Sequence, residues 1–236
     1  MLADRRQEPE QEPIMIKNES DAGALSLDFT IDRKDTALLV VDIQNGFCHK
    51  DSAMARAGID TTRQQAVVPN IVRIVRLCRA AGLRILASRQ VHFQNDVTRR
   101  IHKIPSHMDK RNYFPCLRDT WDAELVSEFQ AELRPEDHVF EKHRPSCFFD
   151  TTLDTKMRML GIQMLIVTGV ATNYCVESTI RDAYFRDYDI IVPADCVAST
   201  FPDLQAATLK NVEIYFGRVT SCDGIEIALR ATAGRS

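Results

Sequence analysis

The sequence predicts a single α/β domain in which a mostly parallel central sheet carries helices on both faces. Its length of 236 residues is that of one domain, or of one domain with a tail. Short apolar runs, for example at 37–41 and 164–168, have the length and continuity of strands that are buried on both faces. Between these runs, apolar residues recur at helical spacing. Strands and helices that alternate in this way form parallel sheets, because each crossover places a helix on a face of the sheet.

Each element follows from one of these two patterns. Runs of apolar residues predict strands at 37–41, 84–88, 138–141, 164–168, 189–192 and 214–216. Apolar residues three or four positions apart predict helices at 68–78, 121–133, 152–160, 174–185 and 204–209. Pro69 suits a first helical turn and Gly82 a helix end, so these two residues mark the ends of the first helix.

Two segments fall outside this alternation. Residues 1–30 hold charged residues, Pro and Ser without periodicity, and we expect an extended or partly disordered arm before the domain at 31–236. Residues 93–120 are rich in His, Arg, Asn and Pro and have weak periodicity, which predicts a long surface loop. Long loops in compact domains tend to have a function, so this loop is a candidate for shaping a substrate pocket.

The composition argues against several classes of protein. With 30 Lys and Arg against 33 Asp and Glu, the formal charge is −3, which argues against nucleic acid or a membrane surface as partner. No apolar run approaches the roughly 18 residues of a membrane span, and the polar N-terminus lacks a signal-peptide core. The 7 Cys are scattered without a CxxC pair, so we expect neither a disulfide framework nor a Cys-cluster zinc site. Reduced thiols indicate a cytoplasmic protein.

Reactive side chains follow the predicted strands. Asp42, Arg89 and Lys142 stand at the carboxyl ends of three strands, and the segment Gly169–Cys175 follows a fourth. Active sites in open α/β sheets lie beyond these ends, where the loops after the strands meet. The sequence therefore predicts that these residues lie near one another.

Cys175, Asp42 and Lys142 can act together as nucleophile, base and charge partner. A thiol near a helix N-terminus has its pKa lowered by the partial positive charge there, and backbone amides of the same turn can form an oxyanion hole. A carboxylate can accept the thiol proton, while an ammonium can stabilise the thiolate and the oxyanion. Taken singly, each residue also has a structural interpretation: a small buried Cys, an Asp that caps a turn, and an exposed Lys.

Three motifs occur in order along the chain. Residues 39–47 (LVVDIQNGF) contain D-x-Q-N, residues 142–149 (KHRPSCFF) contain K-x-R-x-S-x-F, and residues 168–176 (TGVATNYCV) contain T-G-x-x-T-N-x-C-V. In order and spacing these motifs resemble those of the isochorismatase-like cysteine hydrolases. The resemblance covers about residues 30–230, nearly the whole predicted domain.

The resemblance implies a fold and a site. The fold is the isochorismatase-like, Rossmann-like three-layer α/β arrangement. The site is a triad of Cys175 as nucleophile, Asp42 as base and Lys142, beside a non-proline cis peptide bond at Val170–Ala171. Backbone amides at Ala171 and Cys175 are expected to hold the oxyanion.

Further expectations concern ligands and partners. We expect a small-molecule amide or ureide substrate, with Gln44, Phe47, His92 and Arg144 as candidate contacts. We expect no cofactor. Relatives commonly form dimers or tetramers, which implies a homo-oligomer.

Within the family, residues 146–154, 175–182 and Phe216–Gly217 are most similar to the ureidoacrylate amidohydrolases of pyrimidine breakdown. Biuret and N-carbamoylsarcosine hydrolases are similar but less close. We therefore expect metal-independent cleavage of a C–N bond in a small amide, ureido or carbamoyl compound through a thioester. Vinyl-ether cleavage, the isochorismatase reaction, needs no thiol, so Cys175 favours the amidohydrolase. The alternative from another class is a catalytically silent binding or scaffold protein.

The resemblance also bears on metal binding. Nicotinamidases of this family have a D-x-H zinc motif just after the second strand, where this chain has Gln90-Val91-His92. The Asp is missing, and His102 and His107 show no clear partner spacing. We therefore predict no metal ion and expect His92 to contact the substrate instead.

Overall fold

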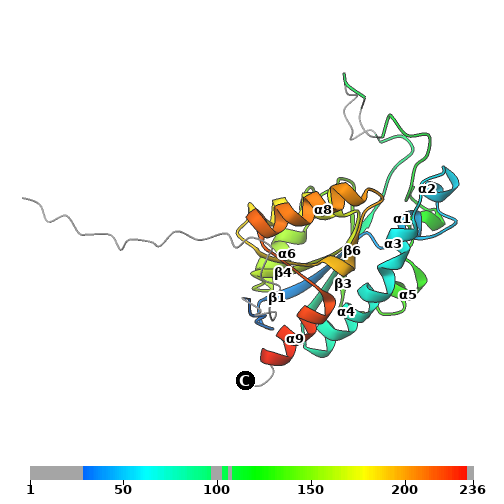
Figure 1. Ribbon diagram of the computed structural model, residues 1–236. Coiled ribbons are helices and arrows are strands. Elements are labelled where there is room, and N and C mark those ends of the chain that lie inside the picture. The colour runs from blue at the N-terminus through cyan, green and yellow to red at the C-terminus, as the bar shows by residue number, and fades with distance from the viewer. Residues whose placement is uncertain (1–28, 97–102, 106–107, 233–236) are drawn as a thin grey trace, which may run out of the picture.

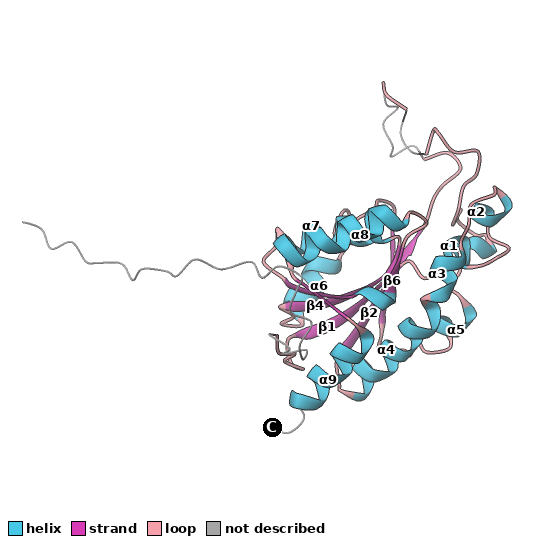
Figure 2. Ribbon diagram, viewed as in Figure 1, coloured by secondary structure: helices cyan, strands magenta, loops and turns pink. Residues whose placement is uncertain are grey.

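A parallel seven-stranded sheet forms the centre of the part of the chain that the structure describes (Figures 1 and 2). This computed structural model describes residues 29–96, 103–105 and 108–232, so the predicted arm lies outside the described residues except for its last two positions. The strands are β1 (Thr36–Val41), β2 (Arg84–Gln90), β3 (His138–Lys142), β4 (Met164–Val170), β5 (Asp189–Pro193), β6 (Val197–Ala198) and β7 (Arg218–Thr220). Their order is β3-β2-β1-β4-β5-β7, and β6 pairs with β4 beside this path.

Helices cover both faces of the sheet. They are α1 (Asn45–Cys48), α2 (Ala53–Arg56), α3 (Thr62–Ala66), α4 (Val68–Ala80), α5 (Ser127–Gln130), α6 (Leu153–Met159), α7 (Glu177–Tyr184), α8 (Pro202–Asn211) and α9 (Cys222–Thr232). In Figures 1 and 2, which share one view, α4, α5 and α9 lie below the sheet, while α6, α8 and, labelled in Figure 2, α7 lie above it. The predicted α/β fold with helices on both faces is confirmed.

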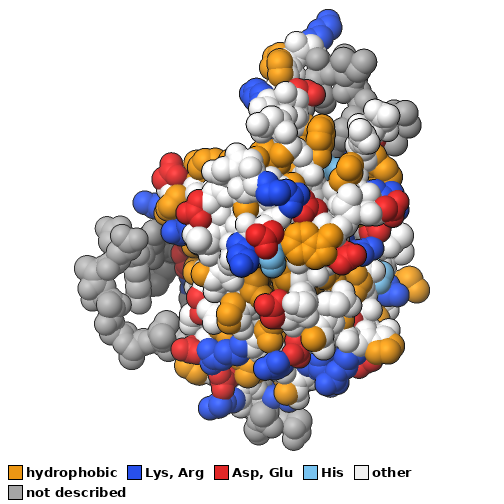
Figure 3. Space-filling view, turned by 90° about the vertical axis from the view of Figure 1, so that its right-hand side faces the viewer, with side chains coloured by type: hydrophobic (Ala, Val, Ile, Leu, Met, Phe, Trp, Pro, Cys, Tyr) orange, Lys and Arg blue, Asp and Glu red, His pale blue; other side chains and the backbone are white. Residues whose placement is uncertain are grey.

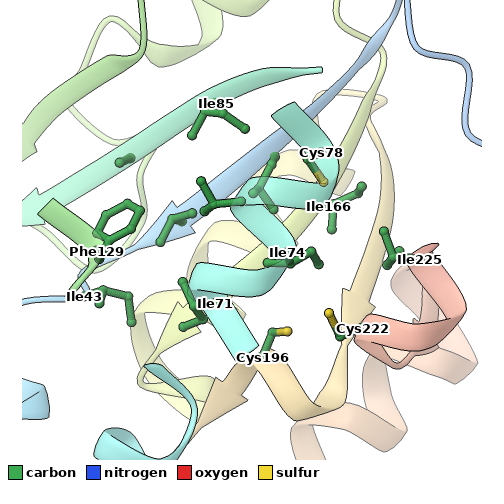
Figure 4. Packing of buried hydrophobic residues seen from close by; sticks show 14 of the residues in the cluster. Ile43, Ile71, Ile74, Cys78, Ile85, Phe129, Ile166, Cys196, Cys222 and Ile225 are labelled. Carbon is green, nitrogen blue, oxygen red and sulfur yellow. The ribbon is translucent and has the colours of Figure 1, made fainter. Parts of the chain in front are cut away.

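Side chains of β1 alternate between two hydrophobic clusters, one on each face of the sheet. Leu38 and Val40 belong to the cluster between the sheet and helices α4 and α9, whereas Leu39 and Val41 belong to the cluster between the sheet and helices α6 and α7. Figure 4 shows the first cluster, in which Ile71 and other side chains of α4 pack against the sheet. Burial on both faces explains why this strand is a continuous apolar run.

The strand order places a crevice at the carboxyl ends of β1 and β4. The chain passes from β1 outward through β2 to β3, then returns to the other side of β1 with β4 and continues to β5. The connections after β1 and after β4 therefore diverge. Ligands of doubly wound sheets bind at this switch point, because the diverging loops leave a crevice there.

The predicted helix at 121–133 is wrong. The chain instead forms a single 3-10 turn at Trp121–Ala123, an extended stretch, and then α5. In the extended stretch, Asn45 N donates to Glu124 O (2.9 Å) and Val126 N donates to Ile43 O (3.0 Å). This pairing with a segment far away in sequence replaces the helical hydrogen bonds that the apolar spacing predicted.

The predicted strand at 214–216 is also wrong. Residues Val212–Phe216 form a π-helical turn that continues α8, and the last strand, β7, begins after Gly217. A β-carbon on Gly217 would lie 2.2 Å from Ile190 O, so this glycine allows the chain to approach β5 closely. The apolar residues of the turn belong to a helical surface and not to a strand.

Helix α9 was not predicted, although the sequence carries a signal for it. Its buried residues include Ile225, Ala228 and Leu229, which have the i, i+3, i+4 spacing of a helix packed on a core. The other predicted strands and helices are found with bounds within three residues of those predicted.

The exposed surface is mixed in charge. Figure 3 shows basic and acidic side chains intermixed on the face that forms the right-hand side of Figure 1. No helix in the described ranges 29–96, 103–105 and 108–232 is both long and apolar enough to cross a membrane.

Gly169 is needed where β4 pairs with Val41 at the end of β1. Its φ is +113°, and a β-carbon there would lie 2.0 Å from Val41 O. Gly169→Ala is expected to destabilise the fold by at least about 2 kcal/mol, because strain at φ adds to a backbone clash. Urea unfolding measures the loss of free energy of unfolding. Gly161→Ala is the matched control, since Gly161 has φ +69° but open space around it. Equal losses in the two variants would contradict the clash.

Candidate active site

Asp42 turns the chain out of β1 and directs a carboxylate into the protein interior. Its φ is +54°, an uncommon conformation that Asp tolerates better than most residues. Its side chain is fully buried. Ser88 Oγ donates to Asp42 Oδ1 over 2.7 Å, and Asp42 Oδ2 lies 2.7 Å from Lys142 Nζ. The carboxylate is therefore fixed from both β2 and β3.

Lys142 is a fully buried ammonium at the end of β3. Besides Asp42, its Nζ donates to Gln90 Oε1 (2.8 Å) and to Arg144 O (3.2 Å). Burial alone would lower the pKa of Lys142, but the charge of Asp42, its hydrogen bond to Lys142 and the neighbouring Cys175 and Cys147 together outweigh burial and hold this pKa above its usual range. An ammonium has three N–H donors, and three acceptors surround this one. Lys142 thus acts as a fixed positive charge.

Cys175 lies in a π-helical turn, Thr172–Val176, between β4 and α7. The thiol is within hydrogen-bonding reach of Asp42, and the residue is 6% exposed. Burial raises the pKa of Cys175 to about 12; the charge of Lys142 lowers it and that of Asp42 raises it. The predicted lowering of this pKa is wrong, because burial and the carboxylate of Asp42 raise it by more than the ammonium of Lys142 lowers it. The thiol is therefore protonated at neutral pH.

The backbone before Cys175 has an unusual geometry. The Val170–Ala171 peptide bond is cis, at the position that the resemblance implies. Ala171 O accepts hydrogen bonds from Tyr174 N (3.0 Å) and Val176 N (3.2 Å). The amides of Tyr174 and Val176 therefore hold the turn. They are different from the amides of Ala171 and Cys175, which the sequence analysis predicts as oxyanion donors.

A cavity of about 300 Å³ opens above Cys175 at the switch point of the sheet. Its wall includes Phe47, Met54, Ile59, Gln64, Gln90, His92, Arg111, Tyr113, Arg144, Pro145, Val170, Ala171, Asn173, Tyr174, Cys175, Ser199, Thr200 and Phe201. Two of these residues, Arg111 and Arg144, are cationic, and none of the described residues in the wall is Asp or Glu. The cavity is mainly apolar with two cationic side chains in its wall, of which Arg144 also pairs with Asp96 (3.6 Å), and such a wall suits a small molecule with one anionic group.

The structure brings together most of the predicted site residues. Phe47, His92 and Arg144 line the cavity with Cys175. Gln44 does not: its buried amide donates to Gln90 O and Ala123 O and accepts from Gln90 N. The expectation that Gln44 contacts the substrate is therefore corrected, because its amide is used to fix the end of β2.

Arg89 also lies away from the cavity wall. It forms an ion pair with Glu141 of β3, 2.7 Å apart. Side chains alternate along a strand, so Ser88 and Gln90 share one side of β2 and Arg89 takes the other. Sequence reasoning missed Gln90 as a cavity residue, although this alternation could have identified it.

The long loop contributes to the site, as expected. Arg111 and Tyr113 reach the cavity from this loop. The Cζ atom of Arg111 lies over the Tyr113 ring, 5.5 Å from the ring centroid. No motif or spacing in the sequence pointed to Arg111 or Tyr113. Within the described residues, no cluster of three or more His, Cys, Asp or Glu side chains has the arrangement of a metal site. His102 and His107 lie outside the described residues.

Comparisons with known proteins identify the family of this chain. The isochorismatase domain model matches residues 36–223. Ureidoacrylate amidohydrolase RutB of Methylorubrum extorquens AM1 is 37% identical over 221 residues, which cover 86% of each chain. The RutB of Serratia proteamaculans is 36% identical over 211 residues, which cover 80% of this chain and 81% of the relative.

Solved structures show the same fold. A cysteine hydrolase from Pseudomonas syringae pv. phaseolicola superposes with a TM-score of 0.73 at 24% identity, covering 86% of this chain and 96% of the other. An N-carbamoylsarcosine amidase from Thermoplasma acidophilum has a TM-score of 0.65 at 26% identity, covering 80% and 97%. The match of fold, domain model and relatives leads to one conclusion: the chain belongs to the isochorismatase family.

Proposed function

We propose that this protein, a hydrolase of amide C–N bonds, uses Cys175 as the nucleophile on a small ureido or carbamoyl compound. One observation carries the proposal: the Cys175 thiol lies in the wall of a cavity, beside a fully buried pair of Asp42 and Lys142. Burying two charges is costly unless the pair has a task or excellent partners. A base and a fixed cation beside a thiol are what a cysteine hydrolase needs.

The first half of the reaction forms a thioester. Asp42 accepts the thiol proton as the sulfur bonds to the substrate carbonyl carbon, and the carbonyl oxygen becomes negative. Backbone N–H groups of Ala171 and Cys175 stabilise this oxygen. The C–N bond then breaks, and the leaving nitrogen takes the proton from Asp42.

The second half releases the product. Water attacks the thioester carbon, Asp42 accepts a proton from it, and the C–S bond breaks. The sulfur regains a proton from Asp42, so the protein returns to its initial state. Throughout, Lys142 stabilises negative charge on the carboxylate, the sulfur and the oxyanion without transferring a proton. A thiol with a raised pKa suits this cycle, because its proton leaves only as the new bond forms.

The proposed substrate is a small ureido acid such as ureidoacrylate. The names of the relatives support this class, and so do Arg111 and Arg144 beside the cavity. Release of ammonia from ureidoacrylate, biuret, carbamoyl amino acids, nicotinamide and maleamate, measured side by side, tests the proposal. We expect turnover of ureidoacrylate. Turnover confined to biuret or carbamoylsarcosine would support those alternatives instead.

Arg111→Gln is expected to lower kcat/KM for a ureido acid about 10-fold, the effect of one lost charge-assisted hydrogen bond. The kcat/KM of the same variant for an uncharged alkylurea should fall only slightly, because that compound has no anionic group for Arg111 to bind. Arg84→Gln is the matched control, since Arg84 is exposed at the opposite end of β2. If both compounds lose activity equally, Arg111 does not recognise the anion.

Metal independence remains a prediction. Dialysis against a millimolar chelator is expected to leave turnover unchanged, since the chemistry proposed here runs through the thiol, Asp42 and Lys142 alone. Metal analysis of the dialysed protein serves as the control. Loss of activity that zinc restores would contradict the prediction.

Assembly and location also remain predictions. Large apolar side chains on the α7–α8 side are exposed, among them Phe185, Phe201 and Tyr215, which supports a homo-oligomer that buries this side. All 7 Cys are free thiols, which supports a cytoplasmic location.

A further inference from the structure

Gln90 is a buried amide in the wall of the cavity. It ends β2 and is 3% exposed. Its backbone N–H donates to Gln44 Oε1 over 2.7 Å, and its backbone carbonyl accepts from Gln44 Nε2 over 2.9 Å. Both backbone groups are therefore occupied, so the side chain is the part of Gln90 that remains to interact with a ligand.

The contact with Lys142 fixes the orientation of this side-chain amide. Lys142 Nζ lies 2.8 Å from Gln90 Oε1. An ammonium only donates hydrogen bonds, so the atom that faces it must be the oxygen and not the nitrogen. Gln90 Nε2 is thus directed away from Lys142. It is buried and, among the described residues, has no hydrogen-bond partner.

A buried amide nitrogen without a partner is costly, and such a group in a binding cavity awaits an acceptor. The same ammonium also donates to Arg144 O, so Gln90 lies on the Arg144 side of the cavity. Lys142 also contacts Asp42, which lies beside the Cys175 thiol, so Gln90 Oε1 faces the reacting groups and Nε2 is directed away from them. The oxygen that meets Gln90 is therefore not the oxygen of the carbonyl group that Cys175 attacks.

We infer that Gln90 Nε2 donates a hydrogen bond to a second oxygen of the substrate, a carboxylate or carbonyl oxygen on the side away from the reacting carbon. This assignment rests on the proposed function. It makes Gln90 a specificity residue that selects substrates with two separated oxygen groups. Its Oε1 meanwhile remains the third acceptor of the catalytic lysine.

Two variants separate substrate contact from support of Lys142. Gln90→Glu keeps an oxygen acceptor for Lys142 but has no donor, whereas Gln90→Met has neither and adds no charge. Gln163→Glu is the matched control, because Gln163 is exposed just before β4, at the amino ends of the parallel strands and away from the cavity. The substrates are ureidoacrylate and propenylurea, which has a methyl group in place of the carboxylate.

We expect both Gln90 variants to lose about 10- to 100-fold in kcat/KM for ureidoacrylate beyond any loss for propenylurea, the range for a hydrogen bond to a charged group. The pH dependence of the rate at which methyl methanethiosulfonate converts the Cys175 thiol into a methyl disulfide, with methanesulfinate as the leaving group, reports separately on whether Lys142 still supports Cys175, because this reagent has no amide for Gln90 to bind. Equal losses on the two compounds, or full activity of Gln90→Glu, would overturn the assignment. Absence of wild-type turnover on both would overturn the proposed function, and the assignment with it.

Discussion

Cys175→Ser is expected to abolish turnover, with a loss of about 10⁴-fold or more, and to leave the fold intact. A serine hydroxyl is far less acidic than a thiol, and Asp42 beside it is too weak a base to remove its proton. The substitution is also small and lies in a turn whose amides are held by Ala171 O. Ammonia release measures the loss, and thermal unfolding verifies that the protein is folded.

The matched control for this variant is Cys78→Ser. Cys78 is also buried, but it belongs to the hydrophobic cluster on the other face of the sheet and does not line the cavity. We expect it to retain most of the turnover. A folded Cys175→Ser protein with wild-type activity would remove this thiol from the mechanism. A wild-type protein that is inactive on every compound in the screen would favour the silent scaffold.

The second large effect concerns the buried ion pair. Lys142→Met and Asp42→Asn are each expected to reduce turnover by at least about 100-fold, but to move the pKa of Cys175 in opposite directions. Lys142 lowers that pKa and Asp42 raises it. Removing the cation therefore raises the thiol pKa, and removing the carboxylate lowers it. Activity is lost in both cases because one variant lacks the fixed charge and the other lacks the base.

Alkylation of Cys175 as a function of pH measures these shifts. In the wild type, the rate should still rise in the alkaline range, because burial raises the pKa of the thiol to about 12. The three groups titrate together, so the measured values belong to the set. If both substitutions shift the profile in the same direction, or neither shifts it, the three residues do not share a site.

Both variants should also be less stable. Each one leaves a fully buried charge without its partner, which typically costs about 3–5 kcal/mol. Urea unfolding tests this loss. The double variant Lys142→Met with Asp42→Asn should recover part of it, since no unpaired charge remains. Without such recovery, the ion pair would not be the source of the instability.

The sequence by itself determined the fold class and the meeting place of the three reactive residues. Continuous apolar runs are sufficient to predict parallel strands, since such strands are buried on both faces. Once Asp42, Lys142 and Cys175 are each placed after a strand, the topology of a parallel sheet brings them together. This step needs no knowledge of side-chain contacts, because every strand points the same way.

Only the tertiary structure decided the surroundings of these residues: how far they are buried and which groups they contact. The pKa of Cys175 is raised and not lowered because desolvation depends on how many atoms surround the thiol, which local sequence does not reveal. Gln44 and Gln90 both stand near the carboxyl end of a predicted strand. In the structure, however, the Gln44 side chain binds backbone groups, whereas Gln90 lines the cavity. Residues 121–133 are not one helix because Ile43 and Asn45 pair with them. In each case, partners distant along the chain compete with the local pattern, and their contribution to the energy exceeds it.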